Sequence, residues 1–167
     1  QEQKDLLTMN QEKKAAQPRD HARLLDGIKA SAAVIESVRE VTDQHVAIGG
    51  RRPGLAVVLV GKDPASSIYV HAKRRDCERA GIVAHDFDLD VSTSQEQLLT
   101  LIDQLNTDPE IDGILVQLPL PSHIHDTQVT NRINPDRDVD GFHAFNVGRL
   151  ALRQPGTAWP HARHDSI

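Results

Sequence analysis

Cysteine is nearly absent from the chain, since only one occurs among its 167 residues. A single thiol excludes a disulfide framework and favours a reducing compartment. The sequence also lacks any apolar run near the roughly 18 residues of a membrane span, and its first twenty residues lack the apolar core of a signal peptide. We therefore expect a cytoplasmic protein without a membrane partner.

An excess of positive charge is absent as well. There are 19 basic and 24 acidic residues, which gives a net charge of −5 and argues against a general nucleic-acid binder. The phosphate-binding patterns GxGxxG and GxxxxGK[ST] and the nucleophile pattern GxSxG do not occur. These observations favour a small molecule as the partner.

The length and the 38% hydrophobic content indicate one domain, because a chain of this size buries roughly 70% of its unfolded surface. Residues 1–22 are charged and rich in Gln, so we expect a flexible tail there. Residues 24–48 carry apolar side chains three or four positions apart behind Asp26, which predicts an amphipathic helix with that residue as its N-cap.

Strands and helices are expected to alternate after that first helix. Unbroken apolar runs predict buried strands over residues 55–60 and 113–116. A further strand is expected over 82–89, with helices over 65–80 and 94–106. Gly81 is expected to end the first of these two helices. The alternation predicts an α/β fold, a three-layer α/β/α arrangement around a mostly parallel sheet of about four strands. Ligands bind at the carboxyl ends of such strands, so the informative loops follow Val60, Leu89 and Val116.

Tyr69 and Lys73 lie four positions apart on the predicted helix after the first strand, so both project from one helix face. A lysine in a pocket can take or relay a proton, and a tyrosine offers a flat apolar ring with a polar tip. The alternative, which spacing alone favours, is an exposed lysine beside a packed tyrosine.

Gln117 follows the last predicted strand directly, where a buried amide is costly unless its donors and acceptor are used. It either contacts a ligand or hydrogen-bonds the loop backbone. Asp138 and Asp140 stand two apart before Gly141, in a loop where one carboxylate can hold a ligand and the other can cap a helix. A carboxylate pairs with two adjacent N–H donors, a geometry that Arg presents and that a 2-amino-4-oxopterin also presents, whereas the alternative is a turn without ligand. His143 is close enough in sequence to reach the same pocket, although a lone histidine is more often structural or solvated.

Two histidine pairs, His123 with His125 and His161 with His164, invite a metal interpretation. Neither pair comes with cysteines or a HExxH context, so we expect no metal site. Cys77 is most simply a small buried hydrophobe on the helix that carries Lys73.

Three segments together resemble the amino-terminal half of the methylenetetrahydrofolate dehydrogenase/methenyltetrahydrofolate cyclohydrolase family. They read PGLAVVLVGKDPASSIYVHAKRRDCERAGI, DGILVQLPLP and PDRDVDGFHAFNVGRL, and the likeness runs over residues 24–154. The resemblance implies a folate-binding catalytic domain over residues 23–154 and a divergent tail over 155–167. It implies one-carbon chemistry, in which methylenetetrahydrofolate is oxidised with NADP and methenyltetrahydrofolate is hydrolysed to 10-formyltetrahydrofolate.

The resemblance also implies the site residues. Lys73 is then the central catalytic residue of cyclohydrolysis, and Gln117 hydrogen-bonds and tunes its amine. Tyr69 packs on the folate rings and contacts the lysine, Asp140 binds the pterin edge, and Ser66 lines the cleft.

The chain departs from the family pattern near Gln154, and the family's Rossmann-like dinucleotide domain is not found after that point. We therefore expect a folate site without a cofactor-binding residue, which puts the dehydrogenase step in doubt. The resemblance is also compatible with a homodimer. The competing interpretation is a non-catalytic chain that binds folate weakly or not at all.

Overall fold

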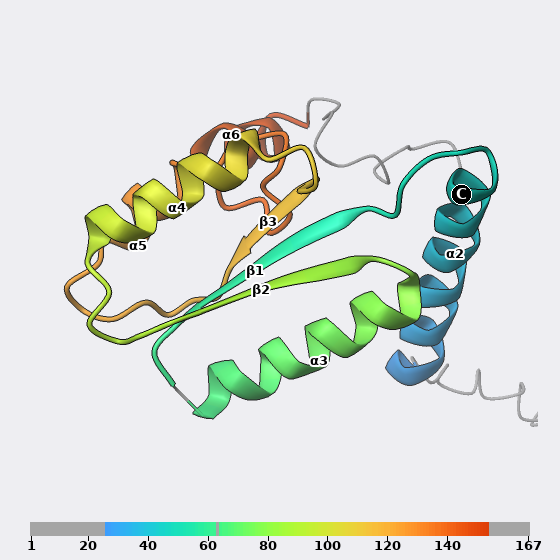
Figure 1. Cartoon of the computed structure of the whole chain (residues 1–167), viewed down its shortest axis with the longest axis horizontal. Coiled ribbons are helices and arrows are strands. Elements are labelled where there is room, and N and C mark those ends of the chain that lie inside the picture. The colour runs from blue at the N-terminus through green and yellow to red at the C-terminus, as the bar shows by residue number, and fades with distance from the viewer. Residues whose placement is uncertain (1–25, 63, 154–167) are drawn as a thin grey trace, which may run out of the picture.

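The computed structural model describes residues 26–62 and 64–153, and every structural statement below concerns these residues. They form an α/β unit of three strands and five helices (Figure 1). The strands are β1 (Gly54–Val60), β2 (Val83–Leu89) and β3 (Gly113–Val116), and the helices are α2 (Gly27–Ala47), α3 (Pro64–Ala80), α4 (Gln95–Thr107), α5 (Asp126–Thr130) and α6 (Ala144–Ala151). None of the helices found in this part of the chain has the length and apolar character of a membrane span.

The sheet has the order β2-β1-β3 and is parallel throughout. The prediction of about four strands was therefore wrong by one. The residues beside the free edge of β3 form only an isolated parallel bridge between Ile114 and Asp138. The chain turns away after this bridge at Gly141, whose positive φ of 70° suits a residue without a side chain.

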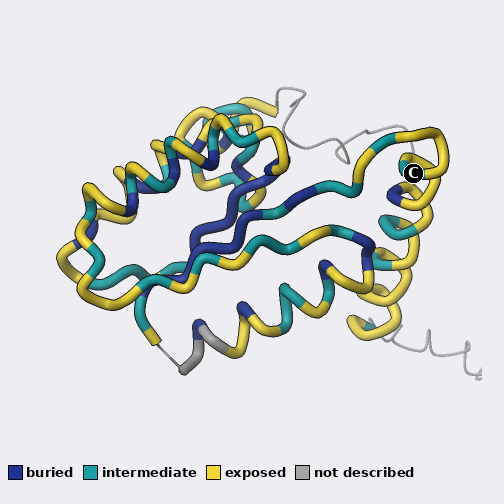
Figure 2. Tube along the Cα trace, in the orientation of Figure 1, coloured by how far each residue is buried: buried dark blue, intermediate teal, exposed yellow. Residues whose placement is uncertain are grey.

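Alternate side chains of β1 enter two separate cores, which confirms the three layers. Ala56, Val58 and Val60 pack on one face against Leu98 and Ile102 of α4. Val57 and Leu59 point to the other face, where Val70 of α3 covers them. Figure 2 shows the buried residues concentrated in β1, β3 and the inner side of α4. A strand buried on both faces needs the continuous apolar run that the sequence has there.

The helix boundaries follow local signals. The Asp26 side chain accepts hydrogen bonds from the backbone N–H groups of Ile28 and Lys29, so the predicted N-cap of α2 is confirmed. Ser94 forms a capping box with Gln97 at the start of α4. Gly81 ends α3 with a φ of 77°, as expected.

The apolar pattern of α2 does not correspond to a buried face. Helix α2 packs beside α3 rather than on the sheet, and Thr42 is its buried residue. Ile28 is 85% exposed and Val41 is 62% exposed, although both belong to the predicted apolar face. The prediction of the helix was right, while the burial of these two residues was wrong because no sheet surface lies opposite them.

Candidate functional site

The carboxyl edge of the sheet collects the polar residues that the sequence singled out. Strand β3 ends at Val116, and the backbone N–H of Gln117 extends its ladder by donating to the carbonyl of Val58. Helix α3 starts from the same edge after β1 and presents Lys73 toward β3. A parallel sheet therefore brings residues far apart in the sequence to one place.

Lys73 and Gln117 are in direct contact. The Lys73 Nζ donates to the Gln117 Oε1 at 3.2 Å, and the Gln117 Nε2 donates to the Leu118 carbonyl at 2.6 Å. Both side chains are half-buried. Because its amide nitrogen is fixed by the loop backbone, Gln117 turns its oxygen to the lysine. Of the two alternatives left open for Gln117, the structure shows the hydrogen bond to the loop backbone, and it adds a contact with Lys73 that the spacing did not indicate.

Asp140 completes the cluster from the loop before α6. Burial raises the pKa of its carboxyl group, the positive charge of Lys73 opposes that rise, and the negative charge of Asp138 adds to it. The carboxylate is therefore partly desolvated and lies within the electrostatic field of the lysine. Such a group gains from a ligand that brings hydrogen-bond donors.

Asp138, two residues earlier, has a different environment. It is 3% exposed, and its carboxylate accepts hydrogen bonds from the backbone N–H groups of Gly141, Phe142 and His143. The structure thus gives the two aspartates different environments, since the Asp138 carboxylate binds the backbone of its own loop and the partly buried Asp140 lies within the electrostatic influence of Lys73. His143 is the N-cap of α6, and its Nδ1 accepts from the backbone N–H of Phe145 at 3.1 Å. This arrangement gives His143 a structural role.

Tyr69 and Ser66 lie on α3, one and two turns before Lys73. Tyr69 is 63% exposed, so its ring is open to a ligand, whereas Ser66 is 3% exposed and belongs to the buried side of the helix. Cys77 is buried as expected, and burial raises the pKa of its thiol. A buried thiol with a raised pKa is a poor nucleophile, so the role of Cys77 is to pack in the interior.

The metal interpretation gains no support in the described part of the chain, where no group of three His, Cys, Asp or Glu side chains is placed to hold an ion. The His123 ring is hydrogen-bonded to the Thr93 carbonyl at 2.9 Å, and His125 stands at the N-cap position of α5 without a side-chain cap hydrogen bond. His161 and His164 lie outside the described residues, as do the expected tails over 1–22 and 155–167.

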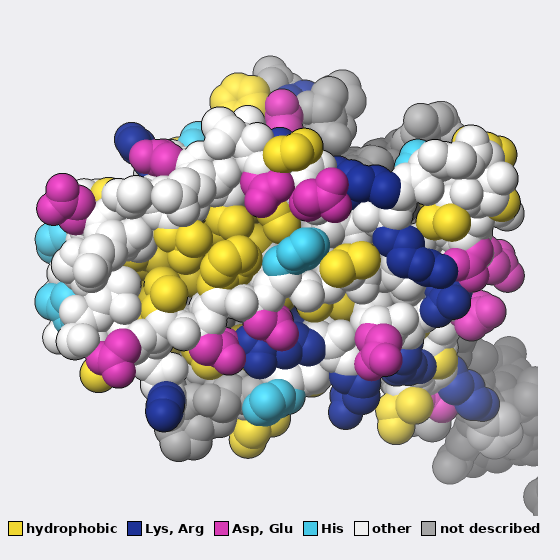
Figure 3. All heavy atoms as spheres, in the orientation of Figure 1, with side chains coloured by type: hydrophobic (Ala, Val, Ile, Leu, Met, Phe, Trp, Pro, Cys, Tyr) yellow, Lys and Arg dark blue, Asp and Glu magenta, His cyan; other side chains and the backbone are white. Residues whose placement is uncertain are grey.

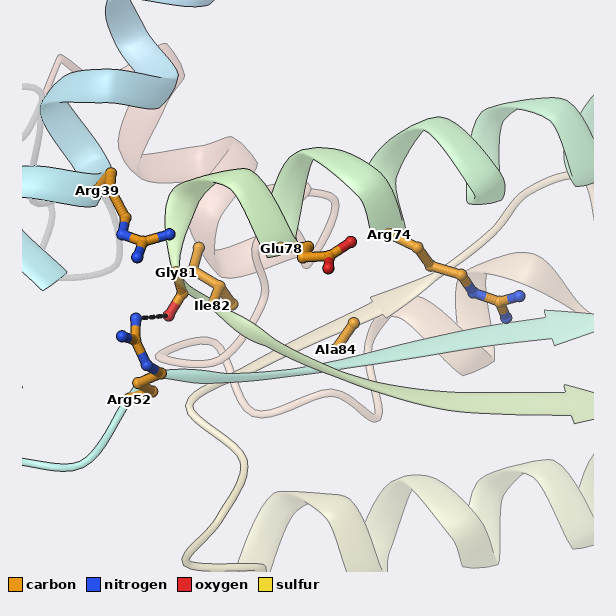
Figure 4. Close-up of a pocket in the computed structure, with 7 residues that line it drawn as sticks. All are labelled: Arg39, Arg52, Arg74, Glu78, Gly81, Ile82 and Ala84. Carbon is orange, nitrogen blue, oxygen red and sulfur yellow. Dashed lines mark hydrogen bonds between the residues drawn. The ribbon is translucent and has the colours of Figure 1, made fainter. Parts of the chain in front are cut away.

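Two hollows lie away from Lys73. One of about 420 Å³ sits at the amino end of β2, between Arg39, Arg52 and Glu78 (Figure 4). Its arginines are already paired, because Arg39 and Arg52 share Asp43 and Arg52 donates to the Gly81 carbonyl. The other, of about 350 Å³, lies on the β2 side of α3 and is lined by Leu59, Gly61, Lys62, Val70, His71, Arg74, Asp88, Leu89 and Asp90. Neither hollow includes the Lys73, Gln117 and Asp140 cluster.

The surface has separate apolar and charged regions. Figure 3 shows hydrophobic side chains gathered between α4 and the edge of the sheet, with mixed basic and acidic side chains over α2 and the end of α3. The apolar side of α6 is open, with Phe145 53% and Leu150 81% exposed. Sequence analysis did not single out Asn146 on this helix, although its buried amide donates to Asp138. The sequence shows that Asn146 follows Asp138 by eight residues. This spacing does not predict that the two side chains form a hydrogen bond.

Comparison with known proteins supports the resemblance. Residues 25–140 match the family described as tetrahydrofolate dehydrogenase/cyclohydrolase, catalytic domain. The chain is 40% identical to a 5,10-methylenetetrahydrofolate dehydrogenase from the silkworm Bombyx mori, with a TM-score of 0.78 over 81% of this chain and 47% of that one. It is 42% identical to a bifunctional methylenetetrahydrofolate dehydrogenase/cyclohydrolase from Campylobacter jejuni, with a TM-score of 0.78 over 80% of this chain and 47% of that one.

A third solved structure is the Trypanosoma brucei methylenetetrahydrofolate dehydrogenase-cyclohydrolase complexed with NADP and an inhibitor. It is 32% identical, with a TM-score of 0.76 over 81% of this chain and 46% of that one. The chain thus spans about half the length of the solved relatives it matches. The match over residues 25–140, together with the shared fold, shows that this chain belongs to the tetrahydrofolate dehydrogenase/cyclohydrolase family.

Proposed function

We propose that this chain binds a folate at the carboxyl edge of its sheet and hydrolyses 5,10-methenyltetrahydrofolate to 10-formyltetrahydrofolate. The observation that carries the proposal is the hydrogen bond from Lys73 to Gln117 beside the partly buried Asp140. All three residues fall within the segment 25–140 that matches the family. Family membership supplies the substrate class.

Recognition of the substrate rests on Asp140 and Tyr69. The carboxylate of Asp140 accepts the adjacent N–H donors of the 2-amino-4-oxopterin edge, which restores the hydrogen bonds that burial removed. The exposed ring of Tyr69 packs against the planar parts of the folate. Ser66 lies deeper on the same helix and is proposed to line the inner end of the cleft.

Lys73 is proposed to manage the protons of hydrolysis. Water adds to the methenyl carbon, a C–O bond forms, and the water gives up a proton as the addition proceeds. The bond from that carbon to N5 then breaks with its electron pair on N5, the added hydroxyl loses its remaining proton to solvent as the C=O bond forms, and the formyl group remains on N10. An amine beside the carbon can take the first proton and return one to the leaving nitrogen, while the Gln117 oxygen holds the amine in place.

NADP is not assigned to these residues. A dinucleotide needs a glycine-rich turn between a strand and a helix, so that backbone N–H groups reach the pyrophosphate. Helix α3 begins with Pro64, which has no N–H, and the turn from β2 to α4 contains no glycine. The described residues therefore do not fit the cofactor, and no hydride-transfer step is assigned to them. NADP is bound in the solved structure of the Trypanosoma brucei relative.

The remaining parts of the proposal follow from the same features. We place the domain boundaries at 23–154 and the protein in the cytoplasm, which the unpaired Cys77 supports. A homodimer fits the open apolar side of α6. The competing function is weak folate binding without turnover, and it differs from the first in one measurable property, the rate of methenyltetrahydrofolate hydrolysis.

The test is the loss of methenyltetrahydrofolate absorbance with purified chain, corrected for the uncatalysed rate. We expect Lys73→Ala to lower the enzymatic rate on the order of 10²–10⁴-fold, because a positioned acid–base group is removed. Lys29→Ala is the matched control, since Lys29 lies at the exposed start of α2 and its pairing with Asp26 spans 4.0 Å. An unchanged rate in Lys73→Ala would refute the assignment, and binding of folic acid without hydrolysis would establish the competing function.

A further inference from the structure

Asp138 is the most heavily hydrogen-bonded carboxylate near the proposed site. Its Oδ1 accepts from the backbone N–H groups of Gly141 at 3.1 Å and Phe142 at 3.3 Å. Its Oδ2 accepts from the backbone N–H of His143 and from the Asn146 Nδ2, both at 2.9 Å. One side chain thus receives four donors, three of them from the loop that directly follows it.

This carboxylate is also fixed to the rest of the fold. Asp138 forms a parallel bridge with Ile114 of β3, next to the hydrogen bond from the Ile114 N–H to the Arg137 carbonyl at 2.7 Å. Asn146 ties the opposite side, because its Nδ2 also donates to the Pro135 carbonyl at 2.9 Å. The loop is therefore anchored between the edge strand and α6, with the buried Asp138 side chain at its centre.

Asp140 lies inside this loop but takes no part in its hydrogen bonds to Asp138. The three N–H groups that bind Asp138 belong to the residues immediately after Asp140, so they determine the direction in which the chain leaves it. The parallel bridge sets the chain two residues before Asp140 level with Ile114. The chain on both sides of Asp140 is therefore held in place beside β3, the strand that Gln117 directly follows, and Asp140 lies within the electrostatic influence of Lys73.

We propose that Asp138 and Asn146 are positioning residues for the folate site, which hold the loop so that Asp140 faces Lys73 and the pterin edge. The proposal rests on the proposed function for the identity of the ligand. Neither residue needs to contact the folate, and both are at least nine-tenths buried. Their contribution is made through Asp140.

The charge of Asp138 gives the proposal a second consequence. Among the described residues, the charged groups that act on Asp140 are Lys73 from α3 and Asp138 from its own loop. Burial and Asp138 raise the pKa of Asp140, while Lys73 lowers it. Removal of the Asp138 charge is therefore expected to lower the pKa of Asp140 as well as to loosen the loop.

The first measurement needs no ligand. In Asp138→Asn an amide nitrogen replaces one acceptor oxygen, so the N–H groups of Gly141, Phe142 and His143 lose part of their partners. We expect amide hydrogen exchange at these three positions to speed up by about 10-fold or more. Amides of β1 should keep their protection, which shows that the sheet is intact. Carbon NMR of the Asp140 carboxyl group should show its titration at lower pH than in the unchanged chain.

The second measurement is a binding cycle with folic acid, which carries the same 2-amino-4-oxopterin edge. We expect Asp138→Asn and Asp140→Asn each to weaken binding by about 10-fold or more. The double variant should bind no more weakly than Asp140→Asn alone, because Asp138 acts through that residue. Asp126→Asn, which removes one exposed carboxylate from α5, is the matched control and should bind like the unchanged chain.

Asn146→Ala repeats both measurements with the Asp138 charge retained, in case the aspartate variant does not fold. Unaltered exchange at Gly141, Phe142 and His143 in the folded variants, or additive losses of binding in the cycle, would overturn the proposal. Absence of folic acid binding by the unchanged chain would instead refute the proposed function. In that case the exchange rates and the Asp140 titration still decide whether Asp138 positions the loop.

Discussion

Arg137 connects the proposed site to the main core, and its replacement is expected to destabilise the fold strongly. The Arg137 Nη1 donates to the carbonyl oxygens of Leu105 at 2.8 Å, Asp108 at 2.9 Å and Ile111 at 2.6 Å. Two of these carbonyls belong to the end of α4, where the helix itself supplies no further N–H donors, although the Asp108 carbonyl also accepts from the Ile111 N–H at 3.3 Å. A cation at a helix carboxyl end is also favoured by the helix dipole.

The size of the effect follows from these bonds. One nitrogen has two hydrogens for three acceptors, so about two hydrogen bonds of a charged donor are lost in Arg137→Met. At about 1.5 kcal/mol each, the low end for a half-buried group, the free energy of unfolding should fall by about 3 kcal/mol. For a unit of this size that loss corresponds to a Tm lower by about 6–12 °C. Methionine keeps the length of the stem, so the loss of packing is small.

The matched control is Arg132→Met. Arg132 forms two bonds of 2.6 Å with Asp103, but both side chains are about half exposed. Solvent screening leaves such an exposed pair with little effect on stability. Urea and thermal denaturation followed by far-ultraviolet circular dichroism measure both variants. Equal losses for Arg132→Met and Arg137→Met would refute the reasoning, because burial of the acceptors would then make no difference.

Three further predictions concern the core, the site and the cofactor. Ile102→Ala should lower the free energy of unfolding by about 2–5 kcal/mol, since Ile102 is fully buried between α4 and β1, and a loss below 1 kcal/mol in urea titration would contradict this packing. Asp140→Asn should raise the thermal stability at pH 7, because a carboxyl group whose pKa is raised on folding opposes folding when charged. This gain should disappear as the pH falls through the folded pKa to below the ordinary aspartate value, and a variant less stable than the parent at pH 7 would contradict the sign. NADP should give no binding heat in calorimetry, and a dissociation constant in the low micromolar range would reveal a cofactor site that the described residues do not show.

Much of the fold was predictable because its signals are local. The four apolar residues of β3 were expected as a buried strand and form one over Gly113–Val116. The end of α3 at Gly81 and the start of α2 after Asp26 were also predicted, since each depends on the conformation or side chain of one residue. The parallel arrangement followed from the alternation of elements.

Other features had no local signal. Helices α5 and α6 were not predicted, because α5 has five residues and α6 begins after a histidine N-cap rather than a typical Ser, Thr, Asp or Asn. The predictions of a fourth strand and of a buried apolar side of α2 were wrong for a related reason. An apolar pattern shows which face of an element is able to be buried, but the neighbouring elements determine whether anything covers it.

The candidate site divides along the same line. The sequence by itself determined the chemistry of the participants, since the lysine, the glutamine and the two aspartates were recognisable from residue type, position at strand ends and family resemblance. Only the tertiary structure decided that Lys73 contacts Gln117, which is 44 residues away. It also decided that the Asp138 carboxylate is hydrogen-bonded by its own loop, while Asp140 lies within the electrostatic influence of Lys73. The physical reason is that a hydrogen bond depends on the distance and direction between two groups. Parallel strand pairing and buried loop contacts set that geometry, and spacing along the chain does not record it.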